Sequence, residues 1–368
     1  MIDYLLVTFC IVSLIQSFYY LLFLTPLLGY KQNNNKNSEP ISVVVCAKNE
    51  AQNLKTFIPK ILKQDYPSGF EIVIINDRST DTTAEVLSLL AEANSNIKIV
   101  NIEDCEHFWG NKKYALTLGI KAATHQQLLF IDADCFPASD NWIQEMASKF
   151  SIDKTLVLGY GAYQKEPGSW LNKLIRYETL MTAIQYFSYA KIGIPYMGVG
   201  RNLAYMKSEF YKVKGFIKHM HIKSGDDDLF INQVATSQNT TYNINRKSFT
   251  ISPPKSSYKA WIRQKRRHIS TASQYKFHHK FLLALFYLSQ LSFFLIALVL
   301  LVNNEHLKEV FVLMAIRYSA QLISLGIFSK KLDEKDLILY MPFLELFLIF
   351  FQLYIYLKNK TSSPVQWQ

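Results

Sequence analysis

Cysteine is scarce in this chain of 368 residues, which contains only Cys10, Cys46, Cys105 and Cys135. The four are scattered, and their spacing matches no paired metal-binding motif. Disulfide frameworks belong mainly to oxidising compartments and to small, cysteine-dense domains. The sequence therefore predicts no disulfide scaffold, and it favours a reducing, cytoplasmic setting for the bulk of the chain.

Glycine is also sparse, with 13 residues, and it is missing where phosphate-binding loops need it. A dinucleotide-binding fold would have a glycine-rich turn after its first strand, but residues 46–53, CAKNEAQN, contain no glycine. The Gly-x-Gly stretches at 159–161 and 198–200 lie far downstream, and no Gly-x4-Gly-Lys-Ser/Thr motif occurs. A nucleotide bound by this protein must therefore be held without a glycine-rich phosphate-binding loop.

Acidic residues are outnumbered, with 29 against 40 basic ones and a formal net charge of +11. The chain is 49% hydrophobic and 19% charged, which is too apolar for an average soluble domain and too charged for membrane helices alone. Residues 4–29 carry no formal charge, and about 20 apolar residues suffice to cross a bilayer. We predict an uncleaved anchor in residues 1–30, because Asp3 occupies the place of a basic signal-peptide region and no cleavage motif follows.

Further apolar stretches predict membrane helices within residues 280–358. They lie at about 281–302, 309–328 and 336–357. The last two are weaker predictions, because Arg317 interrupts one and Glu345 the other.

The basic residues predict which side of the membrane each segment occupies. They cluster at 264–268, 276–280 and 329–335, and basic flanks stay in the cytoplasm. Four spans would place both termini outside and residues from about 31 to 280 inside. The positive charge thus indicates topology and contact with anionic membrane lipids, and no nucleic acid is expected as a partner.

The central region, residues 40–275, alternates between two patterns. Short runs rich in Val and Ile, typical of buried strands, lie at 41–47, 70–77, 97–102 and 127–134. Helical spacing occupies 50–64, 80–93 and 112–124 between them. Strands separated by helices predict an α/β fold with a mostly parallel, doubly wound sheet.

Polar residues stand where these strands end, which is where such sheets bind ligands. The strand at 127–134 ends in Asp132 and Asp134, one position apart. One carboxylate can face a sugar while the other meets a divalent cation, because Mg²⁺ and Mn²⁺ favour oxygen ligands and bridge diphosphates. An Asp-x-Asp by itself equally fits two capping or loop aspartates.

The ordered set of motifs resembles the membrane-bound family-2 glycosyltransferases and their nucleotide-sugar-binding GT-A fold, over about residues 40–270. The motifs that carry the resemblance are VVVCAKNE, IINDRSTDTT, GNKKYALTLGI, DADC, GVGRNLAY, SGDDDLF and QKRRH. The resemblance implies one N-terminal and about three C-terminal transmembrane helices around a GT-A domain. It also implies an enzyme that transfers a sugar.

The resemblance assigns roles to individual residues. The donor side comprises Ala47, Asn49, Glu50, Asp77, Lys112, Asp132 and Arg267, with Asp77 reading the base and Lys112 directed to the diphosphate. Asp134, with Asp132, implies a site for Mg²⁺ or Mn²⁺. Gly200, Asn202 and His268 fall on the acceptor side, and Gln264 and Arg267 belong to a Gln-x-x-Arg-Trp-like motif in which His268 replaces the tryptophan. That replacement puts stacking on the acceptor in doubt.

The general base is expected among Asp226, Asp227 and Asp228. The family's Asp-x-x-Leu spacing, counted back from Leu229, selects Asp226, with Asp227 as the alternative and Asp228 assigned to the helix. Three adjacent carboxylates repel one another, so the pKa of at least one should rise. Capping of the following helix is an alternative role for this cluster.

Two helical segments keep two interpretations each. Residues 258–270 place Trp261, Ile262 and Ile269 among basic residues, a pattern typical of a helix at the membrane surface that binds lipid or donor. Residues 170–196 are aromatic and weakly amphipathic, and they could line an acceptor groove or form core.

The sequence thus predicts an inverting, metal-dependent glycosyltransferase that uses a UDP-sugar at the cytoplasmic face of a bacterial inner membrane. Its acceptor would be a lipid or a lipid-linked glycan. The alternatives are a processive polysaccharide synthase, for which four spans form a thin channel wall, and a non-catalytic nucleotide-sugar-binding scaffold.

Overall fold

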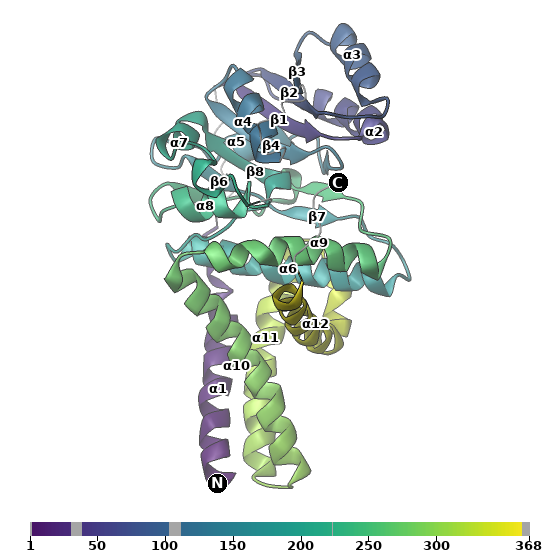
Figure 1. The fold of residues 1–368 in the computed structure, drawn as a ribbon. Coiled ribbons are helices and arrows are strands. Elements are labelled where there is room, and N and C mark those ends of the chain that lie inside the picture. The colour runs from purple at the N-terminus through teal and green to yellow at the C-terminus, as the bar shows by residue number, and fades with distance from the viewer. Residues whose placement is uncertain (1, 31–38, 103–111, 223, 363–368) are drawn as a thin grey trace.

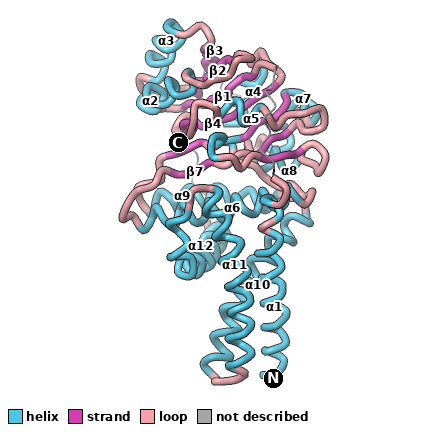
Figure 2. Tube along the Cα trace, turned by 180° about the vertical axis from the view of Figure 1, so that it is seen from behind, coloured by secondary structure: helices cyan, strands magenta, loops and turns pink. Residues whose placement is uncertain are grey.

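The computed structural model describes residues 2–30, 39–102, 112–222 and 224–362 (Figure 1). An α/β domain forms one end of the molecule, and two long helices, α6 (Trp170–Lys191) and α9 (Tyr258–Thr271), lie side by side beneath it. Helices α1 (Ile2–Leu22), α10 (Phe277–Val302) and α11 (Leu307–Lys331) extend away from this layer, as the view from behind also shows (Figure 2).

The main sheet has the strand order β3-β2-β1-β4-β8-β6-β9 in the described part of the chain. Its strands are β1 (Ile41–Ala47), β2 (Phe70–Asp77), β3 (Ile97–Ile102), β4 (Gln127–Asp132), β6 (Leu156–Leu158), β8 (Leu203–Met206) and β9 (Thr240–Tyr242). The first four in chain order pair in parallel, whereas β8 runs antiparallel to both β4 and β6. The predicted α/β fold with a mostly parallel sheet is therefore confirmed.

Both faces of this sheet are buried, which explains why its central strands are continuous apolar runs. Val44 and Cys46 of β1 pack in the cluster that contains α4 (Lys112–Ala122) and α6. Val43 and Val45 point the other way, into a cluster with α2 (Ala51–Leu62), α3 (Thr83–Ala93) and α5 (Trp142–Ala147). The alternation fixes the register of the strand and thereby the position of the residues that follow it.

Shorter elements complete the edge of the domain that faces α6 and α9. A second sheet has the order β5-β10-β7, with β5 (Phe136–Pro137), β7 (Gly161–Tyr163) and β10 (Thr250–Ser252). Helices α7 (Lys207–Lys212) and α8 (Asp228–Val234) flank β8. Most of α6 is buried, and several of its side chains also line the cavity described below, so the two interpretations of residues 170–196 both hold for parts of it.

In the part of the chain that the structure describes, four helices are long and apolar enough to cross a membrane by length and composition: α1, α10, α11 and α12 (Met341–Thr361). Three of them run alongside one another, but α12 lies across their direction, directly beneath α6 and α9 (Figures 1 and 2). Arg317 and Glu345, which interrupt two of the predicted spans, are both fully buried and pair with each other. Tyr20 donates a hydrogen bond to the same carboxylate.

Candidate active site

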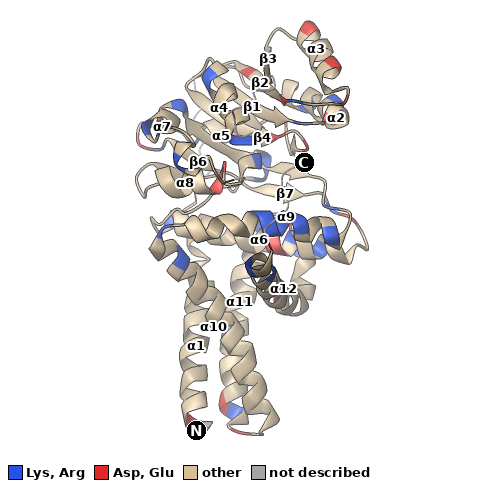
Figure 3. Cartoon of the chain, viewed as in Figure 1, with Lys and Arg blue, Asp and Glu red and all other residues tan. Residues whose placement is uncertain are grey.

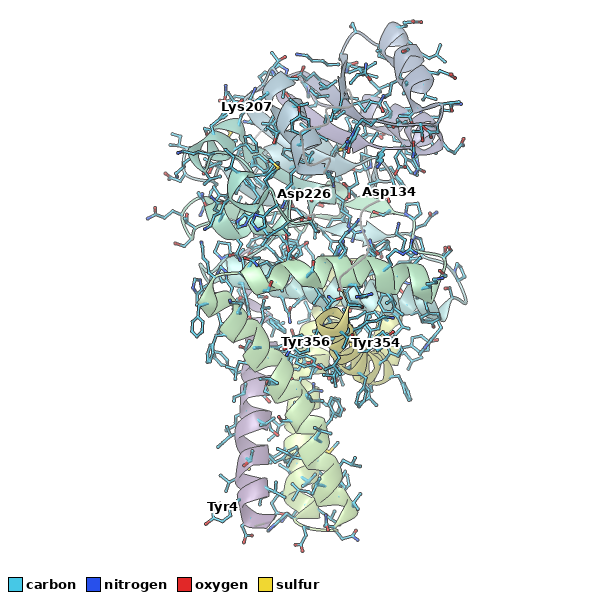
Figure 4. All side chains as sticks on the ribbon, viewed as in Figure 1. Tyr4, Asp134, Lys207, Asp226, Tyr354 and Tyr356 are labelled. Carbon is cyan, nitrogen blue, oxygen red and sulfur yellow. The ribbon has the colours of Figure 1, made fainter. Side chains whose placement is uncertain are left out.

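A cavity of about 650 Å³ lies between the α/β domain and the layer formed by α6 and α9. It adjoins the carboxyl end of β4, as expected for ligand sites in such sheets. Asp134 and Asp226 both lie at the edge of the α/β domain that faces α9 (Figure 4). The structure brings the following predicted site residues together in its wall: Glu50, Lys112, Asp132, Asp134, Gly200, Asp226, Asp227, Gln264, Arg267 and His268.

Lys112, at the start of α4, connects two acidic parts of the cavity. Its Nζ lies 2.7 Å from Oδ1 of Asp132 and 3.1 Å from Oδ2 of Asp226. Burial would lower the pKa of Lys112, but the charges of Asp132 and Asp226 raise it well above its usual value. Burial likewise opposes ionisation of Asp132, yet the ammonium group of Lys112 holds the pKa of Asp132 below its usual value. Both groups are therefore charged at neutral pH.

Asp132 and Asp134 lie close enough to share one cation. Their oxygens and the Cys135 sulfur all lie within 4.8 Å of one another. The thiol is not a suitable ligand, because burial and then the charge of Asp134 raise the pKa of Cys135 well above its usual value. Its Sγ also lies 2.8 Å from Oγ of Ser252. The remaining donors are carboxylate oxygens, a set that fits Mg²⁺ or Mn²⁺ completed by substrate oxygens.

The acidic cluster lies at the N-terminal end of α8. Asp227 caps this helix, since its Oδ1 accepts a hydrogen bond from the backbone N–H of Asp228 at 2.8 Å. Its Oδ2 accepts another from the backbone N–H of Gly200 at 2.7 Å. Burial, followed by the charges of Asp226 and Asp228, raises the pKa of Asp227 to about 7. The predicted pKa rise within the cluster is thus found at Asp227, and burial raises the pKa of Asp228 as well.

Asp228 has a different environment from its two neighbours. It is the first residue of α8, and its carboxylate accepts hydrogen bonds from the hydroxyl groups of Thr271 and Tyr275, the latter at 2.6 Å. These contacts attach α8 to the C-terminal end of α9. The assignment of Asp228 to the helix agrees with this position.

The three predicted site residues of α9, Gln264, Arg267 and His268, line the cavity together because they are spaced three and four positions apart. Nε2 of Gln264 lies 3.4 Å from the hydroxyl of Tyr163. Among the described residues, no hydrogen bond or ion pair engages the guanidinium of Arg267, which leaves its donors available to an anion. Withdrawal from bulk solvent, together with the charges of Lys265 and Arg267, holds the pKa of His268 well below its usual value, so its ring is neutral.

Four predicted site residues lie outside the cavity wall: Ala47, Asn49, Asp77 and Asn202. Asn49 has a φ of 57°, and its Oδ1 accepts a hydrogen bond from the N–H of Thr80, so it joins the loops that follow β1 and β2. Asp77 is 1% exposed and accepts a hydrogen bond from Nε of Arg78 at 2.9 Å. Asn49 and Asp77 therefore lie at the ends of β1 and β2 without lining the cavity.

Asn202 is fully buried, and its amide has no free group for an acceptor. Its Nδ2 donates to the carbonyl oxygens of Tyr160 and Ser248, both at 2.8 Å. Its Oδ1 accepts a hydrogen bond from Trp142. In this structure Asn202 holds the turn that presents Gly200 to the cavity, which differs from the expected position beside the acceptor.

Arg201 is a cavity residue that the sequence interpretation passed over. Its Nη1 lies 3.1 Å from Oγ of Ser252, its Nη2 donates to the carbonyl of Gly161, and its guanidinium stacks 4.2 Å from the Tyr163 ring centroid. Its position between Gly200 and Asn202 in GVGRN was the available signal. Arg201 therefore adds a fixed positive charge to the wall near Asp132 and Asp134.

The opposite end of the cavity is apolar. Leu283 of α10 and Leu348 and Phe351 of α12 line it, and Gln352 contributes one polar group. Basic residues gather along α9 (Figure 3), and Arg263, Lys265 and Arg267 of this helix line the cavity. One cavity thus joins a charged site at the sheet to helices apolar enough to lie in a membrane.

Comparison with known proteins agrees with this architecture. Residues 42–222 match the model of glycosyl transferase family 2. The chain is 30% identical to the glycosyltransferase AglE of Haloferax volcanii over 112 residues. This matched segment makes up 30% of this chain and 35% of AglE. It is also 32% identical to the poly-β-1,6-N-acetyl-D-glucosamine synthase of Staphylococcus epidermidis over 103 residues. This segment makes up 28% of this chain and 24% of the synthase.

A third curated protein is also similar over part of the chain. The 4,4′-diaponeurosporenoate glycosyltransferase of Staphylococcus aureus is 27% identical over 118 residues, which covers 32% of this chain and 30% of that protein. The matched segments thus span about a quarter to a third of these relatives.

Among solved structures, the mannosyltransferase PcManGT from Pyrobaculum calidifontis, in complex with GDP-Man and Mn²⁺, has a TM-score of 0.57 and 18% identity. The superposition covers 94% of this chain and 99% of that one, so the shared fold includes the long helices. With the family match and the sheet order, it follows that this chain carries a family-2 glycosyltransferase domain of the GT-A fold, joined to helices long and apolar enough to be membrane spans.

Proposed function

We propose that this protein is an inverting glycosyltransferase that moves one sugar from a UDP-sugar to a lipid or lipid-linked glycan. The reaction takes place at the cytoplasmic face of the membrane, where nucleotide sugars are available. The proposal rests on the observation that one cavity has two different ends. Its charged end contains Lys112, Asp132 and Asp226, and its apolar end contains Leu283 and Phe351. A nucleotide sugar fits the first end and the chain of an amphiphilic acceptor fits the second.

The donor is held by charge. Arg267 and Lys112 face the leaving diphosphate, and Arg201 reinforces the positive field in the wall. Asp132 and Asp134 would hold Mg²⁺ or Mn²⁺, which would supply further neutralisation of the diphosphate. Asn49 and Asp77 lie behind the cavity wall and support the loops that would contact the nucleoside.

Transfer is a single displacement at the anomeric carbon. The carboxylate of Asp226 takes the proton of the acceptor hydroxyl while the acceptor oxygen bonds to that carbon. The bond from the anomeric carbon to the diphosphate oxygen breaks, and its electron pair leaves with the diphosphate, so the configuration inverts. Asp227 is the alternative base, since a pKa of about 7 suits proton transfer near neutrality, although backbone N–H groups occupy both of its oxygens.

The experiment uses the full chain in lipid nanodiscs with membrane lipid extract. UDP-sugars and GDP-sugars that carry a radiolabel are supplied separately, and the lipid phase is analysed for labelled products. A lipid that gains one labelled sugar from a UDP-sugar supports the proposal, and Asp226→Asn is the matched control for contamination. Labelled lipid from a GDP-sugar alone would refute the donor, a long polymer would indicate a processive synthase, and binding without any turnover would indicate a scaffold.

A further inference from the structure

Both ends of α12 are fastened to the side of the molecule that carries the α/β domain. Just before the helix, Glu334 and Asp336 accept hydrogen bonds at 2.8 Å from Arg176 of α6. Arg176 and Glu334 are almost fully buried, so this contact is shielded from solvent. The N-terminal end of α12 therefore lies against the helix layer beneath the active site.

The C-terminal end of α12 lies against the same layer. Nε of Arg266 in α9 donates to Oδ1 of Asn359 at 2.9 Å, and its Nη2 donates to Oγ of Ser362 at 2.8 Å. The side-chain amide of Asn359 in turn donates to the backbone carbonyl of Arg266 at 2.9 Å. These reciprocal hydrogen bonds hold the last turn of α12 at the α/β side.

Between its ends α12 packs along its length on α6 and α9. Trp261 of α9 is completely buried and stacks on Phe351, with ring centroids 4.1 Å apart. Leu344 and Ile355, one near each end of the helix, are also completely buried. This packing agrees with the crosswise orientation of α12 in Figures 1 and 2.

The opposite face of α12 is apolar and uncovered. Phe343, Phe347, Phe350, Tyr354 and Leu357 recur every three or four positions on it, and Phe343 is 70% exposed. Lys358 and Lys360 follow at the end of the helix, with their ammonium groups over the rings of Tyr354 and Tyr356. Apolar residues with tyrosine and lysine at the edge are typical of a helix at a membrane interface.

We infer that α12 lies in the plane of the membrane leaflet next to the α/β domain and does not cross the bilayer. A crossing helix of 21 residues would carry its far end about 30 Å away, whereas Arg266 holds that end at the starting side. Of the helices in the described part of the chain, α1, α10 and α11 then cross the bilayer. Asp3 lies 3.2 Å from His306, which places the start of α1 beside the loop between α10 and α11 at the other side.

This arrangement changes the expected topology and gives α12 a role in the site. With three spans, the end of α12 lies on the same side as the α/β domain, instead of both termini lying outside. Leu348 and Phe351 on its buried face line the apolar end of the cavity, so α12 forms the floor of that end within the leaflet. This last step rests on the proposed function: an amphiphilic acceptor would enter sideways over α12.

The depth of α12 in the bilayer can be measured with nitroxide labels on single cysteines. The background carries Cys10→Ser and Cys105→Ser, because Cys46 and Cys135 are buried. Labels at Phe343→Cys, Phe350→Cys and Leu357→Cys should report one similar, shallow depth in power-saturation measurements with oxygen and a nickel chelate. Labels at Leu288→Cys, Leu295→Cys and Val302→Cys on α10 serve as the matched control and should cross the midplane. A profile on α12 that also crosses the midplane would overturn the inference.

The side on which α12 ends can be tested with a membrane-impermeant thiol reagent. Thr361→Cys should be labelled from the same side as Ile152→Cys, which is 99% exposed on the α/β domain, in both intact cells and inverted vesicles. Labelling of the two from opposite sides would refute the inference. Neither measurement depends on sugar transfer, so a failed activity assay would leave the inference about α12 intact. Labelling of both cysteines from outside the cell would instead refute the cytoplasmic location proposed for the active site.

Discussion

The Lys112 ammonium nitrogen lies 3.1 Å from Oδ2 of Asp226, the carboxylate proposed as general base. The same nitrogen lies 2.7 Å from Asp132, so one ammonium group contacts both the side of the cavity proposed for the donor and the side proposed for the acceptor. An arriving diphosphate offers Lys112 a stronger anionic partner than either carboxylate. Donor binding should therefore draw Lys112 away from Asp226, which couples donor occupancy to the position of the proposed base.

Asp226→Asn should remove transfer while leaving donor affinity nearly unchanged. Asparagine preserves the size of the side chain but cannot take the acceptor's proton, and loss of a general base typically lowers the rate by about 10² to 10⁴. Calorimetric titration of the UDP-sugar and turnover on one nanodisc preparation measure the two effects separately.

Asp228→Asn is the matched control for that variant. Its carboxylate bonds Thr271 and Tyr275 at the junction of α8 and α9, so the change should lower the melting temperature with a far smaller loss of rate. Wild-type turnover in Asp226→Asn together with an inactive Asp227→Asn would move the base to Asp227. Activity in both would place it outside this cluster.

Asp134→Ala should weaken Mn²⁺ binding and donor binding together. The variant leaves Asp132 as the single carboxylate for the cation, and the diphosphate would then face unneutralised acidic groups. Electron paramagnetic resonance of free Mn²⁺ gives the metal affinity without any activity readout. Asp140→Ala, which removes an exposed aspartate outside the cavity, should change nothing. Full transfer in excess chelator would contradict a metal-dependent mechanism.

The raised pKa of Asp227 predicts a pH-dependent stability. Because this pKa is about 7 in the folded protein against 3.8 ordinarily, the native state keeps a proton that the unfolded chain releases. The resulting stabilisation is complete below about pH 4 and is lost as the pH rises through about 7. The melting temperature of donor-free protein should thus fall more steeply from about pH 5 to about pH 8 in the wild type than in Asp227→Asn. Parallel curves would exclude the shift.

Arg317→Met should destabilise the helix bundle strongly. Removal of one partner leaves the fully buried Glu345 without its cation, which typically costs about 3 to 5 kcal/mol. The double variant Arg317→Met with Glu345→Met removes both charges and should recover most of that loss, as measured by thermal unfolding in detergent. Equal destabilisation in the single and double variants would show that the pair has no such coupling.

Leu283→Trp should impair use of the acceptor and spare the donor. The larger ring fills the apolar end of the cavity, so the KM for the lipid acceptor should rise about tenfold, or roughly 1.4 kcal/mol, while the slow hydrolysis of the UDP-sugar without acceptor stays constant. Leu295→Trp on the exposed face of the same helix is the matched control. An unchanged KM would place the acceptor elsewhere.

The sequence by itself determined the order and type of the central elements. Runs such as ISVVVCA are long enough, apolar enough and rich enough in β-branched residues to form only buried strands, and β1 begins and ends as predicted at Ile41 and Ala47. Asp132 follows from the same pattern, because parallel strands bring their carboxyl ends to one edge of the sheet. Lys112 and Asp226 are assigned through the motifs that resemble the family.

Only the tertiary structure distinguishes features that look alike in the local sequence. Asp226, Asp227 and Asp228 are chemically identical in sequence, and only their partners, Lys112, the N–H of Gly200 and the hydroxyl of Thr271, give them different environments. Likewise, apolar length cannot distinguish a crossing helix from one lying in the leaflet, since both bury the same residues from water. The hydrogen bonds of Arg176 and Arg266 at its two ends make that distinction for α12, and they join residues about 90 to 160 positions apart in the chain.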